Sequence, residues 1–321
     1  MVPQIESERM KVITRSLIRK LFDLAQGIPG VISLGIGEPD FVTPAHIREA
    51  AKEALDNGLT HYAPARGIPP LREEVARRYE RDYGVTVDPY KNFYDYNGGI
   101  QALFYAGLAT INPGDDVLLP NPGFFCYENM VKSVGGNVIP YPCPEENEFK
   151  PDFDGLEAAI TPNTKVAFLN FPCNPTGAHV SPDEMQRLVS SLEAHDILVI
   201  SDEVYDMIVY DGYRPVSALQ YSDVERMVVI NSFSKTYAMT GWRIGYTLGP
   251  EQFTMAVERL YENTQACINT AGQYAAVTAL TGPQDFIQEM VSTFDERRKT
   301  IVDGLNDLPG ISCVMPKGAF Y

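Results

Sequence analysis

Residues 165–205 read KVAFLNFPCNPTGAHVSPDEMQRLVSSLEAHDILVISDEVY, and this stretch decides the fold class. It begins with an apolar run over 165–169, continues with a helical pattern over 182–194 and returns to an apolar run over 197–200. Short apolar runs that alternate with helices are typical of α/β folds, and a fully apolar run is typical of a strand covered on both faces. The stretch therefore predicts an α/β protein with a mostly parallel sheet covered by helices.

The same alternation extends in both directions from this stretch. Apolar runs predict further strands over 31–34, 116–119, 137–139, 227–230 and 243–246. Helical periodicity, with proline or glycine near several ends, predicts further helices over 7–25, 44–55, 70–83, 99–111, 124–134, 153–160, 250–263, 270–280 and 285–305.

The two chain ends predict a second, smaller domain. We expect residues 46–285 to form the large domain, and residues 1–45 to form an N-terminal arm and part of a small α+β domain. We expect residues 286–321 to begin the rest of that small domain. The last residues, Gly318-Ala-Phe-Tyr321, read as the start of a strand, so we expect the chain to be part of a longer protein.

The composition excludes several classes of protein. With 26 Lys+Arg against 42 Asp+Glu, the formal charge of −16 repels phosphate backbones, so we expect no nucleic-acid partner. The 45% hydrophobic content, with 18 Tyr and 15 Phe, predicts a packed core. No apolar run approaches the roughly 18 residues of a membrane span, so we expect no membrane partner. Five Cys without CxxC spacing and four scattered His predict neither disulfides nor a metal site, so we expect a cytoplasmic enzyme with an organic cofactor or none.

A lysine follows the predicted strand over 227–230. Lys235 lies in Ser232-Phe-Ser-Lys235, at the strand end where α/β sheets bind ligands. Lysine forms Schiff bases with carbonyl compounds, and burial lowers its pKa to make this possible. The hydroxyls of Ser232 and Ser234 and the guanidinium of Arg243 are typical of a phosphate site. Alone, the motif is far more typical of a surface lysine near a loop.

Polar groups also follow two other predicted strands. Asp202, after the strand over 197–200, has the chemistry to keep a pyridine nitrogen protonated, and Tyr205 the chemistry to bond a ring oxygen. Asn174, after the strand over 165–169, carries an amide that donates hydrogen bonds. Alone, Asp202 is better explained as a helix N-cap, and Asn174-Pro175 is equally typical of a turn.

Two more segments complete the set. Gly98-Gly99 precedes an apolar helix, and the free N–H groups of a helix start bind phosphate. Phe124 follows the strand over 116–119, where an aromatic ring can stack on a flat heterocycle, although core packing is the commoner fate of a Phe. No GxGxxG or GxxxxGK[ST] motif is present. Together the groups match the parts of pyridoxal 5′-phosphate.

The chain resembles the fold-type I pyridoxal-phosphate enzymes, and specifically the class I and II aminotransferases. The resemblance is collinear and is carried by GIGEPDF (35–41), HYAP (61–64), NPTG (174–177), DEVY (202–205) and SFSKTYAMTGWR (232–243). It implies that Lys235 is the Schiff-base lysine and carries the proton between the substrate Cα and the cofactor. It further implies that Asp202 binds the pyridinium nitrogen and that Asn174 and Tyr205 bind the ring's 3′-oxygen.

The resemblance also assigns the other parts of the site. Phe124 stacks on the ring, and the phosphate is bound by Gly99, Ile100, Gln101, Ser232, Ser234 and Arg243. Tyr62 reaches the phosphate of the neighbouring subunit, which implies a homodimer with shared sites. The backbone of Gly37 contacts the substrate carboxylate, with Phe124 and Asn174 near the substrate. Asn121-Pro122 and Asn174-Pro175 are candidates for cis peptide bonds.

The implied reaction moves an amino group from an L-amino acid, of aspartate or aromatic type, to a 2-keto acid such as 2-oxoglutarate. The family's arginine for the substrate α-carboxylate lies beyond the GAFY-like segment and has no counterpart in residues 1–321, so a chain of only these residues should have weak or no activity. The alternatives are a carbon–sulfur β-lyase or racemase with the same cofactor, a non-catalytic ligand-binding module, and an inactive truncated homologue.

Overall fold

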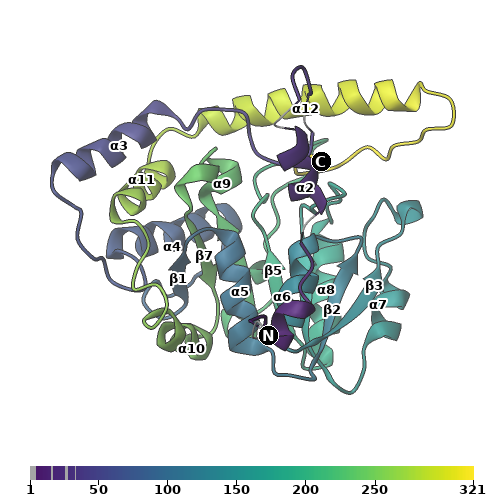
Figure 1. Ribbon diagram of the computed structural model, residues 1–321, viewed down its shortest axis with the longest axis horizontal. Helices are drawn as coiled ribbons and strands as arrows, with labels where there is room; N and C mark the ends of the chain where they lie inside the picture. Colours follow the sequence, from purple (N-terminus) through teal and green to yellow (C-terminus); the bar gives the residue numbers. More distant parts are fainter. Residues whose placement is uncertain (1–4, 16, 26–27, 33) are drawn as a thin grey trace.

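The computed structural model describes residues 5–15, 17–25, 28–32 and 34–321. Within them the sheet has seven strands in the order β1-β7-β6-β5-β4-β2-β3 (Figure 1). The strands are β1 (Phe93–Tyr96), β2 (Asp116–Asn121), β3 (Asn137–Pro142), β4 (Thr164–Asn170), β5 (Leu198–Asp202), β6 (Met227–Ser232) and β7 (Gly245–Leu248). The pairs among β2 to β6 are parallel, and β7 runs antiparallel to both of its neighbours. The predicted α/β class with a mostly parallel sheet is confirmed.

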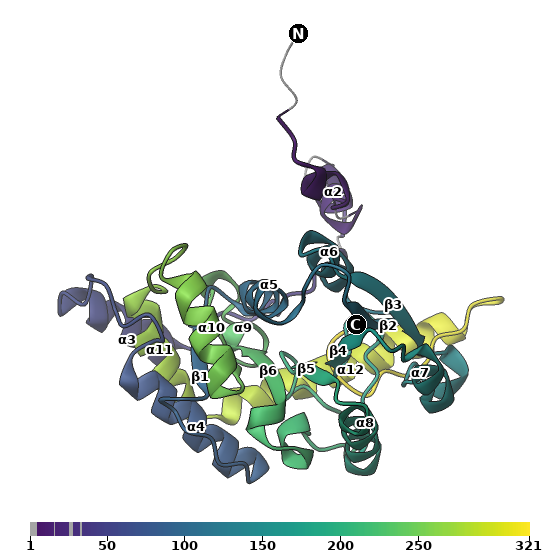
Figure 2. The same ribbon diagram turned by 90° about the horizontal axis from the view of Figure 1, so that it is seen from below.

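Helices cover both faces of the sheet. Figure 2 shows α5 (Gly99–Thr110) and α6 (Phe125–Ser133) on one side, and α4 (Pro69–Tyr83) and α8 (Pro182–Ala194) on the other. The remaining helices are α1 (Glu8–Lys11), α2 (Leu17–Ala25), α3 (Ala45–Asp56), α7 (Phe153–Ala159), α9 (Phe233–Thr236), α10 (Glu251–Tyr261), α11 (Thr270–Thr281) and α12 (Asp285–Asn306), with 3₁₀ turns at Glu145–Asn147, Ala218–Tyr221, Val224–Arg226 and Thr240–Trp242. Of the helices that the structure describes, none has the length and apolar character of a membrane span.

The central strands are apolar because they are buried on both faces. The side chains of β6 are all buried, and those of β4 are buried except at Lys165. Register aligns the polar ends of these strands, since Asn170 of β4 pairs with Asp202 of β5. Asp202 in turn pairs with Ile230 of β6, two residues before Ser232. Asn170, Asp202 and Ser232 therefore share one edge of the sheet.

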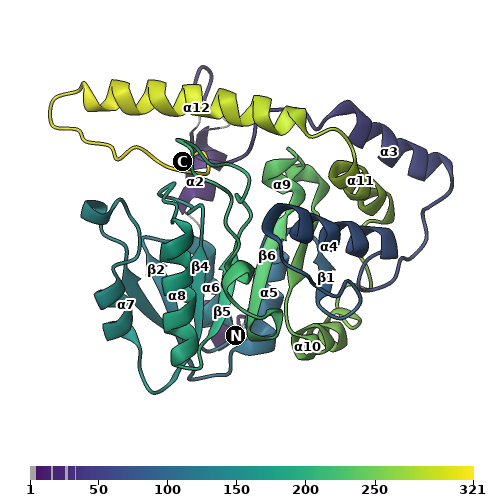
Figure 3. The same cartoon turned by 180° about the vertical axis from the view of Figure 1, so that it is seen from behind.

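Helix α12 and the segment after it cross this edge. Figure 3 shows α12 running over the sheet and the last residues returning toward its centre. The segment is tied down by backbone hydrogen bonds, because Lys317 and Gly318 both donate to the carbonyl of Gly177 at 2.9 Å. Gly318 also forms a β-bridge with Val209. Nothing in these contacts tests the predicted domain boundaries at 45 and 285, which stay a prediction.

Two expectations for the N-terminal segment are wrong. The predicted helix over 7–25 is divided into α1 and α2, because the backbone N–H and C=O of Thr14 bond to the Asn129 side chain at 3.1 and 3.0 Å. The predicted strand over 31–34 does not form at Val31, Ile32 or Leu34, which are exposed and have no strand beside them; residue 33 lies outside the described residues. An apolar run needs a paired neighbour to become a strand.

Two strands also differ from the expectation. β1 is not among the predicted strands, and β7 begins two residues later than predicted. Arg243, the first residue of the predicted strand over 243–246, has a φ of +55°, which is incompatible with a strand.

Both predicted cis peptide bonds, at Asn121-Pro122 and Asn174-Pro175, are present, and Phe171-Pro172 is a third.

Candidate active site

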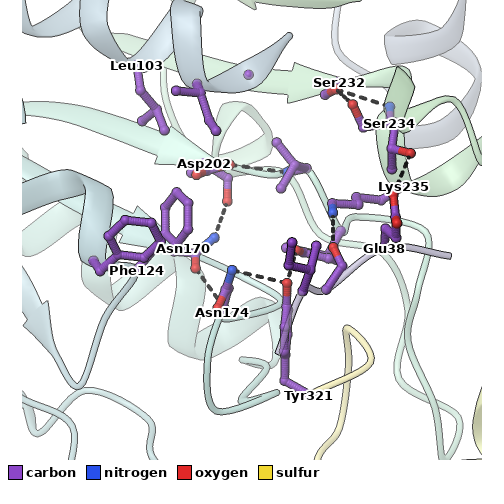
Figure 4. A pocket seen from close by; sticks show the side chains of 18 of the residues that line it. Glu38, Leu103, Phe124, Asn170, Asn174, Asp202, Ser232, Ser234, Lys235 and Tyr321 are labelled. Carbon is purple, nitrogen blue, oxygen red and sulfur yellow. Dashed lines mark hydrogen bonds between the residues drawn. The ribbon is translucent and has the colours of Figure 1, made fainter. Parts of the chain in front are cut away.

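A cavity of about 550 Å³ opens at the carboxyl ends of β4, β5 and β6, beside the start of α5 (Figure 4). Eleven candidate residues from the sequence line it: Gly37, Gly99, Ile100, Phe124, Asn174, Asp202, Tyr205, Ser232, Ser234, Lys235 and Arg243. Gln101 and Tyr62 do not. The Gln101 side chain instead accepts a 2.7 Å hydrogen bond from the backbone N–H of Asn97, and Tyr62 is 89% exposed.

Lys235 lies on α9, directly after β6. Its Nζ donates a hydrogen bond of 2.5 Å to the carbonyl of Gly37, which joins the lysine to the loop over 35–38. The rings of Tyr205 and Phe320 lie 5.6 and 5.5 Å from Nζ. Burial lowers the pKa of Lys235 to about 8, against the opposing charge of Glu38. About a tenth of the amine is therefore neutral, and nucleophilic, at pH 7.

Asp202 ends β5 and is 3% exposed. Its Oδ2 accepts a 2.7 Å hydrogen bond from the hydroxyl of Tyr127, and its Oδ1 accepts one from the N–H of Val204 at 3.4 Å. Burial raises the pKa of Asp202 to about 6, although the Tyr127 hydroxyl acts in the opposite direction. Tyr127 is not among the predicted site residues; its only signal is a position three residues after Phe124 in the first turn of α6.

Asn174 and Tyr205 line the cavity together with Tyr321. The Tyr321 hydroxyl lies 2.7 Å from that of Tyr205 and 3.3 Å from Nδ2 of Asn174. Asn170 anchors this group to the sheet, because its Oδ1 accepts from the N–H of Asn174 at 2.8 Å and its Nδ2 donates to the carbonyl of Asp202 at 3.0 Å. Neither Asn170 nor Tyr321 is singled out by the sequence, since each role depends on a contact distant in the chain.

Hydroxyls, a guanidinium and a helix start gather near α5. Ser232 donates from Oγ to Oγ of Ser234 at 2.8 Å. The Arg243 guanidinium is held by the carbonyls of Thr240 and Asn97, at 2.9 and 3.2 Å. It lies so close to Gly98, the N-cap of α5, that a Cβ there would collide with it. Positive charge and unpaired N–H groups at a helix start favour an anion.

An aromatic wall faces the carboxylate. Phe124 is the N-cap of α6 and makes edge-to-face contacts with Phe125 and Tyr127, at centroid distances of 5.0 and 5.5 Å. Figure 4 shows Phe124 and Lys235 on opposite sides of the cavity, with Asp202 between them. A flat ring can pack against such a wall.

These groups fit pyridoxal 5′-phosphate part by part. The anion site near Arg243 suits the phosphate, and the buried carboxylate of Asp202 suits the pyridine nitrogen. Amide and phenol donors at Asn174 and Tyr205 suit the phenolic oxygen, and the amine of Lys235 suits the aldehyde. The close approach of Arg243 to Gly98 also explains why this position lacks a side chain.

Comparison with known proteins identifies the family. Residues 29–321 match the model of aminotransferase class I and II. The chain is 43% identical to aromatic-amino-acid aminotransferase 2 of Thermococcus litoralis, and 41% identical to an aspartate aminotransferase of Pyrococcus abyssi; each match covers 98% of this chain and 82% of the relative. A solved aspartate aminotransferase of Rhizobium meliloti matches with a TM-score of 0.94 and 36% identity, over 99% of this chain and 81% of that one. The chain therefore belongs to the class I and II aminotransferases and is a transaminase whose cofactor is pyridoxal phosphate.

Proposed function

We propose that the protein transfers the amino group of aspartate or of an aromatic L-amino acid to a 2-keto acid such as 2-oxoglutarate. Two similar relatives, named aromatic-amino-acid aminotransferase and aspartate aminotransferase, support these donor classes. The observation that carries the proposal is the cavity that combines the amine of Lys235 with the buried carboxylate of Asp202.

We further propose the following roles for the cavity residues. Lys235 binds the cofactor aldehyde, Asp202 the ring nitrogen, and Asn174 and Tyr205 the phenolic oxygen. Phe124 stacks on the ring. The phosphate is bound by Gly99, Ile100, Ser232, Ser234 and Arg243, but not by Gln101, which lies outside the cavity lining. The substrate is bound by Gly37, Phe124 and Asn174.

When bound, pyridoxal phosphate condenses with amines, and its protonated ring withdraws electrons from the substrate Cα. The chain supplies the proton transfers. The amine of Lys235, which has a pKa of about 8, would accept the proton that leaves the substrate Cα and return it to the carbon that had been the cofactor's aldehyde carbon. The carboxylate of Asp202 holds a proton at the ring nitrogen. Burial makes the negative charge of this carboxylate unfavourable, and pairing with the positively charged ring nitrogen offsets that cost.

We also propose that the protein is a homodimer with shared sites. The side chains of Ile100, Phe104 and Leu108 lie four residues apart on α5, and they are 56%, 42% and 38% exposed. This spacing gives one apolar stripe along the helix, beside the cavity. In the proposed dimer the stripe is covered by the second copy, and Tyr62 of the partner subunit reaches the phosphate end of the cavity.

A cytoplasmic location completes the proposal. The structure has all five cysteines free, and free thiols persist in reducing compartments.

The donor class is tested by product analysis. The protein is incubated with pyridoxal phosphate, 2-oxoglutarate and one L-amino acid at a time, and glutamate is quantified. We expect aspartate or an aromatic donor to give the fastest glutamate formation. Ammonia and pyruvate formed without a keto acid would indicate elimination instead and would overturn the proposal, as would a preference for an unrelated donor.

A further inference from the structure

Tyr321 adds its hydroxyl to the part of the cavity where the Asn174 amide and the Tyr205 hydroxyl lie. Figure 4 shows Tyr321 reaching from the C-terminal segment toward Asn174. Its hydroxyl lies 3.3 Å from Nδ2 of Asn174 and 2.7 Å from the hydroxyl of Tyr205. The rings of Tyr205 and Tyr321 meet edge to face at a centroid distance of 5.7 Å.

The backbone fixes the position of this hydroxyl. The N–H of Ala319 donates to the carbonyl of Ile208 at 2.9 Å, and the Tyr210 hydroxyl donates to the carbonyl of Ala319. On the other side, the Tyr321 phenol lies so close to Gly37 that a Cβ at Gly37 would collide with it. Tyr321 is therefore held between the loop over 35–38 and the ends of β4 and β5.

The protons of the three groups can be counted. The Asn174 amide nitrogen only donates, so the Tyr321 oxygen accepts from it. The hydroxyls of Tyr321 and Tyr205 lie within hydrogen-bond distance of each other, and either can be the donor. When Tyr321 donates there, the Tyr205 proton is left to be donated to another oxygen in the cavity.

We propose that Tyr321 is a positioning residue that turns Tyr205 into a hydrogen-bond donor for the cofactor's phenolic oxygen and holds the amide of Asn174 beside it. The proposal rests on the roles proposed above for Asn174 and Tyr205. Tyr321 also lines the cavity, and the role proposed for it is exerted through Tyr205 and Asn174.

The proposal has a spectroscopic consequence. With pyridoxal phosphate bound, the nitrogen of Lys235 would carry a proton that is lost as the pH rises, and the cofactor would contribute a negatively charged phenolic oxygen. A donor to that oxygen stabilises its negative charge, which favours loss of the proton. The pH midpoint of the visible colour change is therefore held low by Tyr205, and indirectly by Tyr321.

The experiment compares this midpoint in the loaded wild-type protein and three tyrosine-to-phenylalanine variants. We expect Tyr321→Phe to raise the midpoint by about 0.5 to 1 pH unit, and Tyr205→Phe to raise it at least as much. Tyr141→Phe is the matched control, because it removes a buried hydroxyl that donates to the carbonyl of Phe168, outside the cavity lining. It should leave the midpoint unchanged. Thermal unfolding of each variant checks that the fold is retained.

The outcomes separate this inference from the proposed function. A shift in Tyr205→Phe without one in Tyr321→Phe overturns the role of Tyr321 alone. Equal shifts in Tyr321→Phe and Tyr141→Phe also overturn it, since they indicate a general effect of losing a buried hydroxyl. No shift in Tyr205→Phe, or no colour in the wild-type protein, overturns the proposed site roles and this inference with them.

Discussion

The hydroxyl of Tyr127 donates a 2.7 Å hydrogen bond to Oδ2 of Asp202, and both side chains are buried. Tyr127 extends from α6 and Asp202 ends β5, so the bond joins a helix to the edge of the sheet at the cavity. It opposes the effect of burial on Asp202, because a donor stabilises the charged carboxylate and lowers its pKa.

We predict that Tyr127→Phe raises the pKa of Asp202 above its value of about 6. With less of the carboxylate ionised, kcat should fall by about tenfold, and the acid limb of its pH profile should move to higher pH. Tyr141→Phe is the control, since Tyr141 is equally buried but donates to the carbonyl of Phe168 outside the cavity lining. Equal effects of the two variants on the profile would contradict the role of Tyr127.

Gly98 and Arg243 provide a second prediction. Gly98→Ala places a Cβ against the guanidinium of Arg243, at a φ of +81°. We expect the affinity for pyridoxal phosphate to fall by about tenfold or more, because the guanidinium is displaced from the anion site. An absorbance titration with the cofactor measures this.

The control for Gly98→Ala is Gly212→Ala. Gly212 has a similar φ of +77° but open space around its missing Cβ. Both variants should lose about 1 to 3 kcal/mol of stability from backbone strain. An unchanged cofactor affinity in Gly98→Ala would show that Arg243 is not part of the phosphate site.

Glu203 predicts a pH-dependent stability. Its Oε1 accepts from the Ala218 N–H and the Ser201 hydroxyl at 2.8 and 2.9 Å, while Oε2 has no partner among the described residues. Burial raises its pKa from 4.5 to about 8. Between these values the unfolded chain has released the proton and the folded chain retains it, so the free energy of unfolding falls as the pH rises.

This loss should be absent in Glu203→Gln, which does not titrate. The contribution of Glu203 amounts to at most about 1.4 kcal/mol per pH unit between pH 4.5 and 8. Urea unfolding of both proteins at pH 5 and pH 8 measures the difference, and Asp202 cancels because both proteins contain it. Parallel dependence on pH in the two proteins would rule out a protonated Glu203.

The apolar stripe on α5 yields a prediction about assembly. Phe104→Asp puts a charge at the centre of the stripe, so we expect it to weaken the proposed dimer by roughly a hundredfold or more. Met255→Asp is the control, because Met255 is 49% exposed on α10, away from the stripe. Light scattering after size exclusion gives the mass of each. A dimeric Phe104→Asp, or a monomeric wild-type protein, would contradict the proposed interface.

The sequence predicts those strands that are apolar enough to be buried on both faces, such as β4 and β6. It also predicts the groups at their ends, because the carboxyl ends of parallel strands share one edge. Eleven candidates from six separate segments accordingly line one cavity.

The remaining features depend on contacts that local patterns do not encode. β1 is only four residues long, Phe93-Tyr-Asp-Tyr96, and it contains the buried Asp95, so it lacks an apolar run. The break after α1 follows from the bonds between Thr14 and Asn129, which lie 115 residues apart. Tyr127 and Tyr321 likewise join the site through hydroxyl contacts with residues distant in the chain.

The most direct test of the account locates the covalent bond to the cofactor. The protein is mixed with pyridoxal phosphate, reduced with borohydride to make the linkage permanent, digested and analysed by mass spectrometry. We predict that the added mass lies on Lys235 and that Lys235→Ala is folded but does not turn yellow. Added mass on a different lysine, or a yellow Lys235→Ala protein, would contradict the account.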